Sequence, residues 1–556
     1  MLWCRRLMFV LLVAATASAA FAQAAPHDSG KMSWDFFLVV QAGQRTKAAG
    51  GEAVAATALL TTTQEATASD LEALTALGYT VLGSFGRYVL VEAPADHYTD
   101  PEKGVEGISF VTNVMLPPAS ITNDDAAITS GSEAISAPEA WGLGYRGQGK
   151  KIAIIDGGFD SSNPILAARG AKTYLIKPAG TGPRAYDALE GQVAARSAHG
   201  TSCAIIAGDV APGAELFLLS YPGNTGPVGF LCALAYAVEK LKVDVVSCSM
   251  EFNRPSCHAD GTGFVNEEVT KILAGSTTAL VMASGNWAGG AGGDRWIYNG
   301  SFADPDGDFA HDFTVGAEES WNRNTLAFTA EAGGYVQIVL EWNDWASESK
   351  TTDLNLFLYD SEYHMILSSS TARQFGRAND PVEVVSGELP YSGEYHIMVE
   401  NAAARWYGGT TQTASFQLYV FCQGGGFEDV EHHSTCGTVR EVASNPNVIA
   451  VGAVAPGSGE VREYSSRGPT ASGRAKPELC APDGVTGTVY ESFTGTSASA
   501  PYVAGAIALL RTVKPDLTAA DALAVLQETA ARSVDSCGNA VLAIDIAKAI
   551  AWLKSK

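Results

Sequence analysis

Three residues along the chain have the types and the order that nucleophilic catalysis requires. Asp156 ends the run Ala-Ile-Ile-Asp-Gly-Gly, His199 stands in Ser-Ala-His-Gly-Thr-Ser, and Ser497 stands in Gly-Thr-Ser-Ala-Ser-Ala-Pro. Acyl transfer at neutral pH needs a hydroxyl nucleophile, a base that takes its proton and an anion that orients the base. We predict that Ser497 attacks, His199 shuttles the proton and Asp156 orients His199. Each residue alone also fits a cap or a turn, and only the ordered set favours catalysis.

The same chemistry needs hydrogen-bond donors for the oxyanion that forms when a carbonyl is attacked. Asn286, in Ala-Ser-Gly-Asn, offers a side-chain amide, and Ser497 offers its backbone N–H at the start of an apolar helix. Helix N-termini favour developing negative charge through their unpaired N–H groups and their dipole. Gly495 has no side chain and would let a substrate backbone approach closely. We predict an oxyanion donor at Asn286 and a substrate contact at Gly495.

An α/β framework must position these residues. From Lys151 onward, short continuous apolar runs alternate with helical patterns, which is typical of a parallel sheet flanked by helices. Asp156 would then lie at the carboxyl edge of the sheet, where α/β proteins form their sites. The expected strands are 151–155, 215–219, 243–248, 278–283 and 448–454, and the expected helices are 200–208, 230–241, 266–275 and 497–513.

Two other segments break this rhythm. Residues 294–422 carry period-2 runs, which predict an inserted β-sandwich with strands at 335–342, 353–359, 395–400 and 416–421. Residues 33–116 predict a small α+β module, with strands at 34–40, 79–81 and 88–91, an apolar stretch at 108–114, and a helix at 69–77 that starts with a Ser69–Glu72 capping box. Between this module and the α/β region, residues 117–134 predict a linker and a proteolytic site.

These motifs resemble the subtilisin-like serine proteases, the subtilase family, in which the catalytic residues follow the order Asp, His, Ser. The resemblance covers 135–293 and 423–556 and includes Ala-Pro-Glu-Ala-Trp at 137–141 and Tyr-Ser-Ser-Arg-Gly-Pro at 464–469. It implies a secreted serine endopeptidase that works through an acyl-enzyme intermediate and is made as an autoprocessed zymogen. It also implies that 33–116 is a propeptide. The insert resembles a prepeptidase C-terminal type β-sandwich, which usually follows the catalytic domain.

Three residues beside the predicted site depart from or refine the family's pattern. Gly157 stands where the family usually has a hydroxyl residue after the aspartate, and Ser202 replaces the family's second histidine. Cys203 follows, as in the proteinase K-like branch, in which a cysteine lies beneath the catalytic histidine. These substitutions bear on geometry and pKa without removing a member of the triad.

A fourth departure concerns substrate binding. Ser249, Met250 and Glu251 resemble the strand that lines the S1 pocket, where the family usually has glycine in place of Glu251. We predict that these three residues contact the substrate. The Glu251 carboxylate would either narrow the pocket or favour a basic P1 residue.

Charge and the N-terminus indicate where the protein works. With 60 acidic and 36 basic residues, the net charge of −24 disfavours nucleic acid and anionic membranes as partners. Residues 1–22 have the features of a signal peptide, namely Arg5 and Arg6, an apolar stretch and the small-x-small site Ala-Phe-Ala. We expect a secreted monomer, extracellular or periplasmic, whose partners are polypeptide substrates and its own propeptide.

The reaction requires no cofactor, but cysteines and acidic residues suggest stabilising elements. Asp304, Asp306 and Asp308 alternate as oxygen ligands do in calcium loops, and a solvated turn is the alternative. Eight of the nine cysteines follow the signal peptide, in a compartment that permits disulfides. The candidate pairs are Cys422–Cys436, Cys248–Cys257 and Cys480–Cys537, and buried thiols are the alternative.

Two classes of function therefore stand against each other. The first is the endopeptidase, and the second is a catalytically decayed scaffold that presents the β-sandwich for protein or glycan binding. The complete set of Asp156, His199, Asn286 and Ser497 favours the enzyme.

Overall fold

The chain forms two compact units in a computed structural model. One unit contains residues 1–117 and 290–434, and the other contains residues 118–289 and 435–556. The signal peptide 1–22, the expected strand 34–40 and most of the linker 117–134 lie outside the described residues. The structure describes residues 55–62, 66–85, 87–94, 97–98, 108–115, 120–122, 131–252, 258, 260–289, 294–314, 324–345, 350–362, 365–376, 380–409, 414–423 and 432–556.

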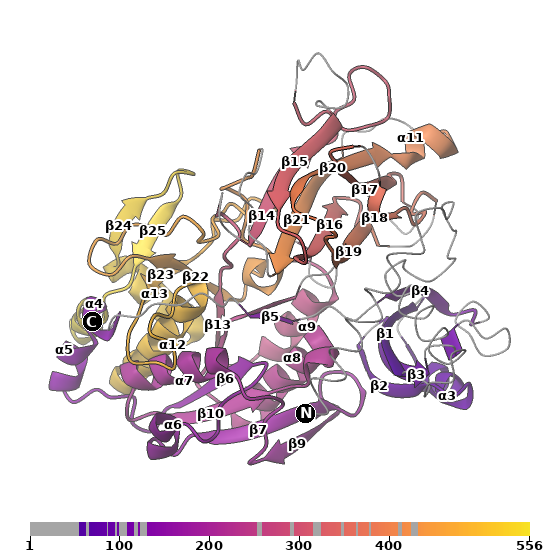
Figure 1. Ribbon diagram of the computed structural model, residues 1–556. Helices are drawn as coiled ribbons and strands as arrows, with labels where there is room; N and C mark the ends of the chain where they lie inside the picture. Colours follow the sequence, from indigo (N-terminus) through magenta and orange to yellow (C-terminus); the bar gives the residue numbers. More distant parts are fainter. Residues whose placement is uncertain are drawn as a thin grey trace. The chain divides into compact units, whose positions relative to one another are not determined.

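A large sheet organises the unit that carries Asp156, His199 and Ser497. In its described part, ten strands lie in the order β24-β25-β23-β22-β13-β11-β6-β10-β7-β9 (Figure 1). Neighbours from β25 to β7 run parallel, and the edge strands β24 and β9 are antiparallel to theirs. The strands are β6 Lys151–Asp156, β7 Lys172–Pro178, β9 Tyr186–Glu190, β10 Glu215–Ser220, β11 Val245–Cys248, β13 Ala279–Ala283, β22 Ile449–Val454, β23 Leu479–Pro482, β24 Ala531–Val534 and β25 Ala540–Ala543.

Helices flank this sheet, so the predicted α/β fold class is confirmed. Helix α12 (Thr496–Val513) is buried along almost its whole length and packs on α7 (Ala198–Val210) and on β22, β13 and β11. The two helices approach closely because Gly505 has no side chain, and a Cβ at this position would lie 2.5 Å from Val210 Cβ. The other helices include α5 Ala137–Gly142, α8 Gly226–Ala235, the π-helix η4 Tyr236–Leu241, α9 Phe264–Leu273, α13 Ala519–Thr529 and α14 Ile546–Lys554.

In its described residues, the N-terminal module has four antiparallel strands in the order β4-β1-β3-β2 and one helix. Its elements are β1 Ala55–Thr62, α3 Ala68–Ala76, β2 Thr80–Phe85, β3 Tyr88–Pro94 and β4 Val111–Met115. The capping box predicted at Ser69–Glu72 is wrong, because Thr67 caps the helix and shares reciprocal hydrogen bonds with Asp70. Both pairs have the same spacing, and only the start of the helix distinguishes them.

The period-2 region forms two four-stranded antiparallel sheets that share one apolar core. In chain order this sandwich lies between β13 and β22. Along β16 the buried residues Val336, Ile338, Leu340 and Trp342 recur every second position, as expected for a strand with one face in a core. One sheet contains β14 Arg295–Ser301, β21 Ser415–Gln423, β16 Tyr335–Trp342 and β19 Val382–Glu388, and the other contains β15 Thr325–Ala330, β20 Gly393–Asn401, β17 Leu354–Asp360 and β18 Met365–Ser370.

One disulfide joins described cysteines, and it differs from the predicted pairs. Cys436 is bonded to Cys537, 101 residues away. The pairs Cys422–Cys436, Cys248–Cys257 and Cys480–Cys537 are therefore wrong, and Cys248, Cys422 and Cys480 are buried cysteines outside disulfides. The prediction relied on short, easily closed loops, whereas the fold brings the turn before β25 to Cys436. Among the described residues, no helix combines the length and the apolar character needed to cross a bilayer.

Candidate active site

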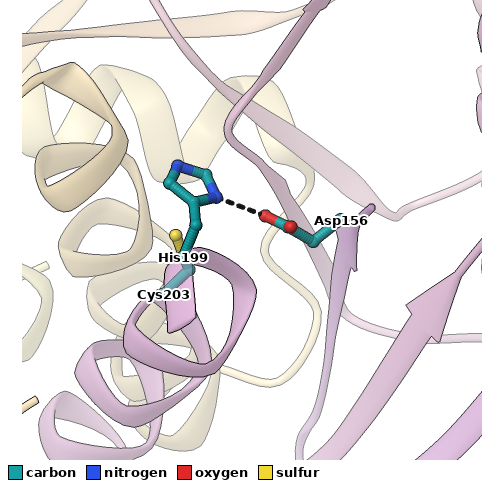
Figure 2. A group of neighbouring side chains, drawn as sticks. All are labelled: Asp156, His199 and Cys203. Atoms are coloured by element: carbon teal, nitrogen blue, oxygen red, sulfur yellow. Dashed lines mark hydrogen bonds and ion pairs between the residues drawn. The ribbon is translucent and has the colours of Figure 1, made fainter. Parts of the chain in front are cut away.

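The end of β6 and the start of α7 bring Asp156 and His199 together. Asp156 is the last residue of β6 and is fully buried, and His199 is the second residue of α7. His199 Nδ1 lies 2.7 Å from Asp156 Oδ2, as Figure 2 shows. A Cβ at Gly200 would lie 2.3 Å from Gly158 O and 2.8 Å from Asp156 Cγ. The absence of a side chain at Gly200 therefore allows the helix to approach the strand closely enough for this contact.

Ser497 reaches the same place from α12. It is the second residue of this helix and is fully buried, and its Oγ makes no hydrogen bond to any described residue. Its carbonyl oxygen accepts hydrogen bonds from Ser249 Oγ at 3.1 Å and from Cys203 Sγ at 3.5 Å. Cys203 lies one turn after His199 in α7 and stands beside it in Figure 2. The helices that carry His199 and Ser497 are thus joined directly at the site.

Asn286 follows β13 and is oriented by the residue before Ser497. Its Oδ1 accepts hydrogen bonds from Thr496 N at 3.0 Å and from Thr496 Oγ1 at 2.9 Å. Because the oxygen is occupied in this way, Nδ2 is turned to the opposite side of the amide. A Cβ at Gly495 would lie 2.9 Å from Asn286 Nδ2, so the amide nitrogen lies beside the turn that precedes Ser497.

The three predicted substrate contacts lie around the same edge. Ser249 directly precedes β12 (Met250–Phe252), and its hydroxyl contacts Ser497 rather than pointing away from the site. Met250 lies beside Gly157, next to Asp156. Glu251 is buried, and its Oε2 accepts a hydrogen bond from Trp287 Nε1 at 2.9 Å.

Trp287 belongs to a buried polar cluster behind the site. The Arg440 guanidinium lies 4.8 Å from the centre of the Trp287 ring and forms an ion pair with Glu441 at 2.9 Å. Glu441 also accepts a hydrogen bond from the Phe252 N–H at 2.5 Å. A Cβ at Gly285 would lie 2.5 Å from Glu251 Oε1, so the Glu251 carboxylate fills the space beside the segment that ends at Asn286. The two effects predicted for Glu251, a narrower pocket and a preference for a basic P1 residue, both stay predictions.

Two residues that the sequence reasoning missed also contact the site. Phe493 stands edge-on to the His199 ring, with centroids 5.5 Å apart. Asp483 is buried and accepts a hydrogen bond from the Gly495 N–H. Burial raises the pKa of its carboxyl group, and the Arg462 guanidinium offsets part of this rise. Asp483 follows the short apolar run 479–482, the same strand-end pattern that singled out Asp156. That pattern would have indicated it.

Among the described residues, two groups of side chains have the types and spacing that could hold a metal ion. The carboxylates of Asp304, Asp306 and Asp308 come within 4.8 Å of one another, but Asp304 accepts hydrogen bonds from the N–H groups of Gly307, Asp308 and Phe309. These bonds suffice for a tight turn, and calcium here stays a prediction. Asp156, His199 and Cys203 also group within 4.8 Å. Since His199 Nδ1 faces Asp156 and Cys203 donates to Ser497, these atoms bond to each other and to the chain rather than to a common centre.

Together the geometry suits acyl transfer. A buried carboxylate fixes one imidazole nitrogen, a serine begins a buried helix, and an amide is held next to that helix start. Such an arrangement can activate a hydroxyl and hold an oxyanion without a bound group. The individual catalytic roles stay predictions.

Comparisons with known proteins point in the same direction. Residues 366–543, which include Ser497, match a family model described as the subtilase family. The major intracellular serine protease of Bacillus subtilis is 31% identical over 155 residues, which cover 26% of this chain and 45% of that protein. Subtilisin E of the same organism is 32% identical over 100 residues, covering 18% and 26%. The chain thus spans less than half the length of these curated relatives.

A solved structure resembles the fold over most of the chain. The CspB protease of Clostridium perfringens superposes with a TM-score of 0.54 and 16% sequence identity, covering 77% of this chain and 99% of that one. At this identity the match establishes the subtilisin-like fold.

Proposed function

We propose that the chain, which matches the subtilase family model over residues 366–543, is a serine endopeptidase that hydrolyses peptide bonds through Asp156, His199 and Ser497. One observation carries the proposal. His199 Nδ1 and Asp156 Oδ2 form a buried 2.7 Å contact, and the same helix bonds to the Ser497 carbonyl through Cys203.

The proposed mechanism uses only side chains and backbone groups of this chain. Ser497 Oγ adds to the substrate carbonyl while its proton passes to His199 Nε2, and His199 Nδ1–H donates to Asp156 throughout. The oxyanion accepts hydrogen bonds from Asn286 Nδ2 and the Ser497 N–H. Collapse breaks the C–N bond, and the leaving amine takes the proton from His199. Water then hydrolyses the acyl-serine by the reverse sequence, so no cofactor is required.

We infer that substrates bind as extended polypeptide. Strand β12 pairs antiparallel with β5 (Ser120–Thr122), with Glu251 opposite Ile121. Ser249, directly before β12, contacts the Ser497 carbonyl. A strand added to β12 therefore runs toward Ser497, which is how strand-addition sites recognise a peptide backbone.

We propose that the chain itself is the first substrate, which would make it an autoprocessed zymogen. β5 occupies the β12 edge and runs toward Ser249. Since β5 runs toward Ser249, the cut should fall after Thr122, within the linker 117–134. The preceding module would then act as a propeptide and as a partner of the protease.

We also propose that the protein acts outside the cytoplasm, extracellular or periplasmic, as a monomer. The signal-like residues 1–22 and the Cys436–Cys537 disulfide support this placement. A net charge of −24 supports polypeptide rather than nucleic acid or anionic membranes as its partner.

The proposal is tested by expressing the chain in an oxidising compartment and treating it with a fluorophosphonate. The wild type should be labelled at Ser497, digest casein and show a new N-terminus shortly after residue 122. Ser497→Ala should stay unlabelled, inactive and uncut. Ser499→Ala is the matched control, because Ser499 lies in the same helix with its hydroxyl bonded to Pro482 O, and it should still be labelled. A folded wild type that is not labelled contradicts the proposal and leaves the binding scaffold as the alternative.

A further inference from the structure

A buried carboxylate lies behind the turn that leads into α12. Asp483 follows β23, and its side chain is 0% exposed. Its Oδ1 accepts a hydrogen bond from Arg462 Nε at 2.6 Å. Its Oδ2 accepts hydrogen bonds from the Tyr464 hydroxyl and from the Gly495 N–H, the latter at 3.2 Å. The Gly495 N–H also lies 3.1 Å from the Tyr464 oxygen, so Asp483 and Tyr464 hold it between them.

Gly495 transmits this constraint to the reacting groups. It adopts φ 98, a conformation that favours glycine, and it directly precedes Thr496 and Ser497. Thr496 donates two hydrogen bonds to Asn286 Oδ1, and Asn286 Nδ2 lies against Gly495. A shift of Gly495 would therefore displace both the proposed nucleophile and the proposed oxyanion donor.

We propose that Asp483 is a positioning residue, which fixes the Gly495–Ser497 turn and thereby the Asn286 amide in the geometry that the transition state requires. This inference rests on the proposed function. The Asp483 carboxylate is buried and its oxygens are bonded to Arg462, Tyr464 and Gly495, so we place its effect on the site at the Gly495 N–H. Misplacing reacting groups by about 1 Å costs on the order of 10²-fold in rate.

The first test compares kcat and KM of Asp483→Ala with the wild type on a peptide substrate. We expect kcat to fall by about 10- to 100-fold and KM to change much less, because the turn positions the reacting atoms and not the bound strand. Tyr464→Phe removes only one hydroxyl from the network and should lower kcat in the same direction by a smaller factor. It also provides a milder variant if Asp483→Ala does not fold.

Glu478 offers a matched control at the opposite end of β23. It is a partly buried carboxylate, 15% exposed, with a basic partner, Lys476, at 2.6 Å, but it bonds to the Ala450 N–H and not to the turn at Gly495. Glu478→Gln should lower the unfolding temperature while kcat of the folded protein stays within about 2-fold of the wild type. A purely structural role for Asp483 would make the two variants behave alike.

A rescue experiment separates positioning from general destabilisation. In Asp483→Asn, the amide oxygen can still accept the hydrogen bond from the Gly495 N–H. The amide NH₂ group then faces the Arg462 Nε–H, and two donors cannot form a hydrogen bond with each other. Adding Arg462→Gln supplies an acceptor for that NH₂ group, and the double variant should regain most of kcat. If folded Asp483→Ala reacts with the fluorophosphonate and its kcat is unchanged, the positioning role of Asp483 is overturned while the proposed function stands. Absence of labelling in the wild type would instead remove the proposed function, and this role with it.

Discussion

At the scale of single residues, His311 shows how strongly the sandwich core controls a titratable group. Phe313 and Phe416 pack against its ring with centroids 4.6 and 4.9 Å away. His311 Nδ1 accepts a hydrogen bond from the Ala303 N–H, and Nε2 lies 3.0 Å from the Tyr298 hydroxyl. Burial lowers the pKa of His311 to about 4.

This lowered pKa predicts an acid-sensitive sandwich. Between about pH 6.5 and 4 the unfolded chain binds a proton at His311 and the folded chain does not, so stability falls as pH falls through this window and levels off below it. The full difference amounts to roughly 3 kcal/mol at most. Chemical unfolding followed by tryptophan fluorescence, in an uncut Ser497→Ala background, measures the slope. His311→Gln should flatten it, whereas His432→Gln, at an exposed histidine, should not.

Asp156 yields a second prediction at this scale. Asp156→Asn keeps the size of the side chain, but its NH₂ group can only donate, which favours the wrong tautomer of His199. We expect kcat on casein or a peptide to fall by about 10³- to 10⁴-fold at neutral pH, with folding retained. An activity within 10-fold of the wild type would contradict the role of Asp156.

At the scale of elements, the site depends on how closely α7 approaches β6. The Gly200 position is crowded by Gly158 O and the Asp156 side chain, so any Cβ there must push the helix away from the strand. The continuous helix expected at 230–241 is α-helical only to Ala235 and continues as the π-helix Tyr236–Leu241.

Gly200→Ala should therefore separate His199 from Asp156. We expect activity to fall by about 100-fold or more, since a displacement near 1 Å is enough for this effect. Gly142→Ala in α5 is the control, because a Cβ there meets nothing within 4 Å and alanine favours helices. Peptide hydrolysis and the unfolding temperature of both variants check the prediction. Equal activity in the two would show that α7 has more room than the structure indicates.

At the scale of the whole molecule, the sandwich and the α/β sheet are independent cores in one chain. The chain leaves the sheet after β13 and returns to it at β22. The second half of the α/β unit must therefore pair with strands that lie far earlier in the sequence. The disulfide between Cys436 and Cys537 joins residues near the start and end of this second half.

Removing this disulfide should destabilise the α/β unit. A bridge across 101 residues restricts the unfolded chain strongly, and its loss should cost about 2–5 kcal/mol. Denaturant unfolding of Cys436→Ser/Cys537→Ser, in the Ser497→Ala background, measures the cost. Cys232→Ser is the control, because Cys232 is a buried cysteine outside any disulfide. Equal stability of the bridged and unbridged proteins would contradict the prediction.

The sequence by itself determined the elements and the order of the reactive residues. Apolar runs predicted β6, β10, β11, β13 and β22, and period-2 runs predicted β16, β17, β20 and β21 of the sandwich but not β14, β15, β18 and β19, because these patterns reflect which neighbouring side chains are buried. The strand-end position of Asp156 and the helix-start position of Ser497 followed from the same local patterns.

Only the tertiary structure decided which distant residues meet. It paired Cys436 with Cys537, turned Ser249 toward the Ser497 carbonyl, enclosed the Glu251 carboxylate with Trp287, and placed Asp483 behind Gly495. Local patterns could not specify these contacts, because each joins segments far apart in the chain. Their distances follow from how the helices and strands pack, and not from the residues beside them in sequence.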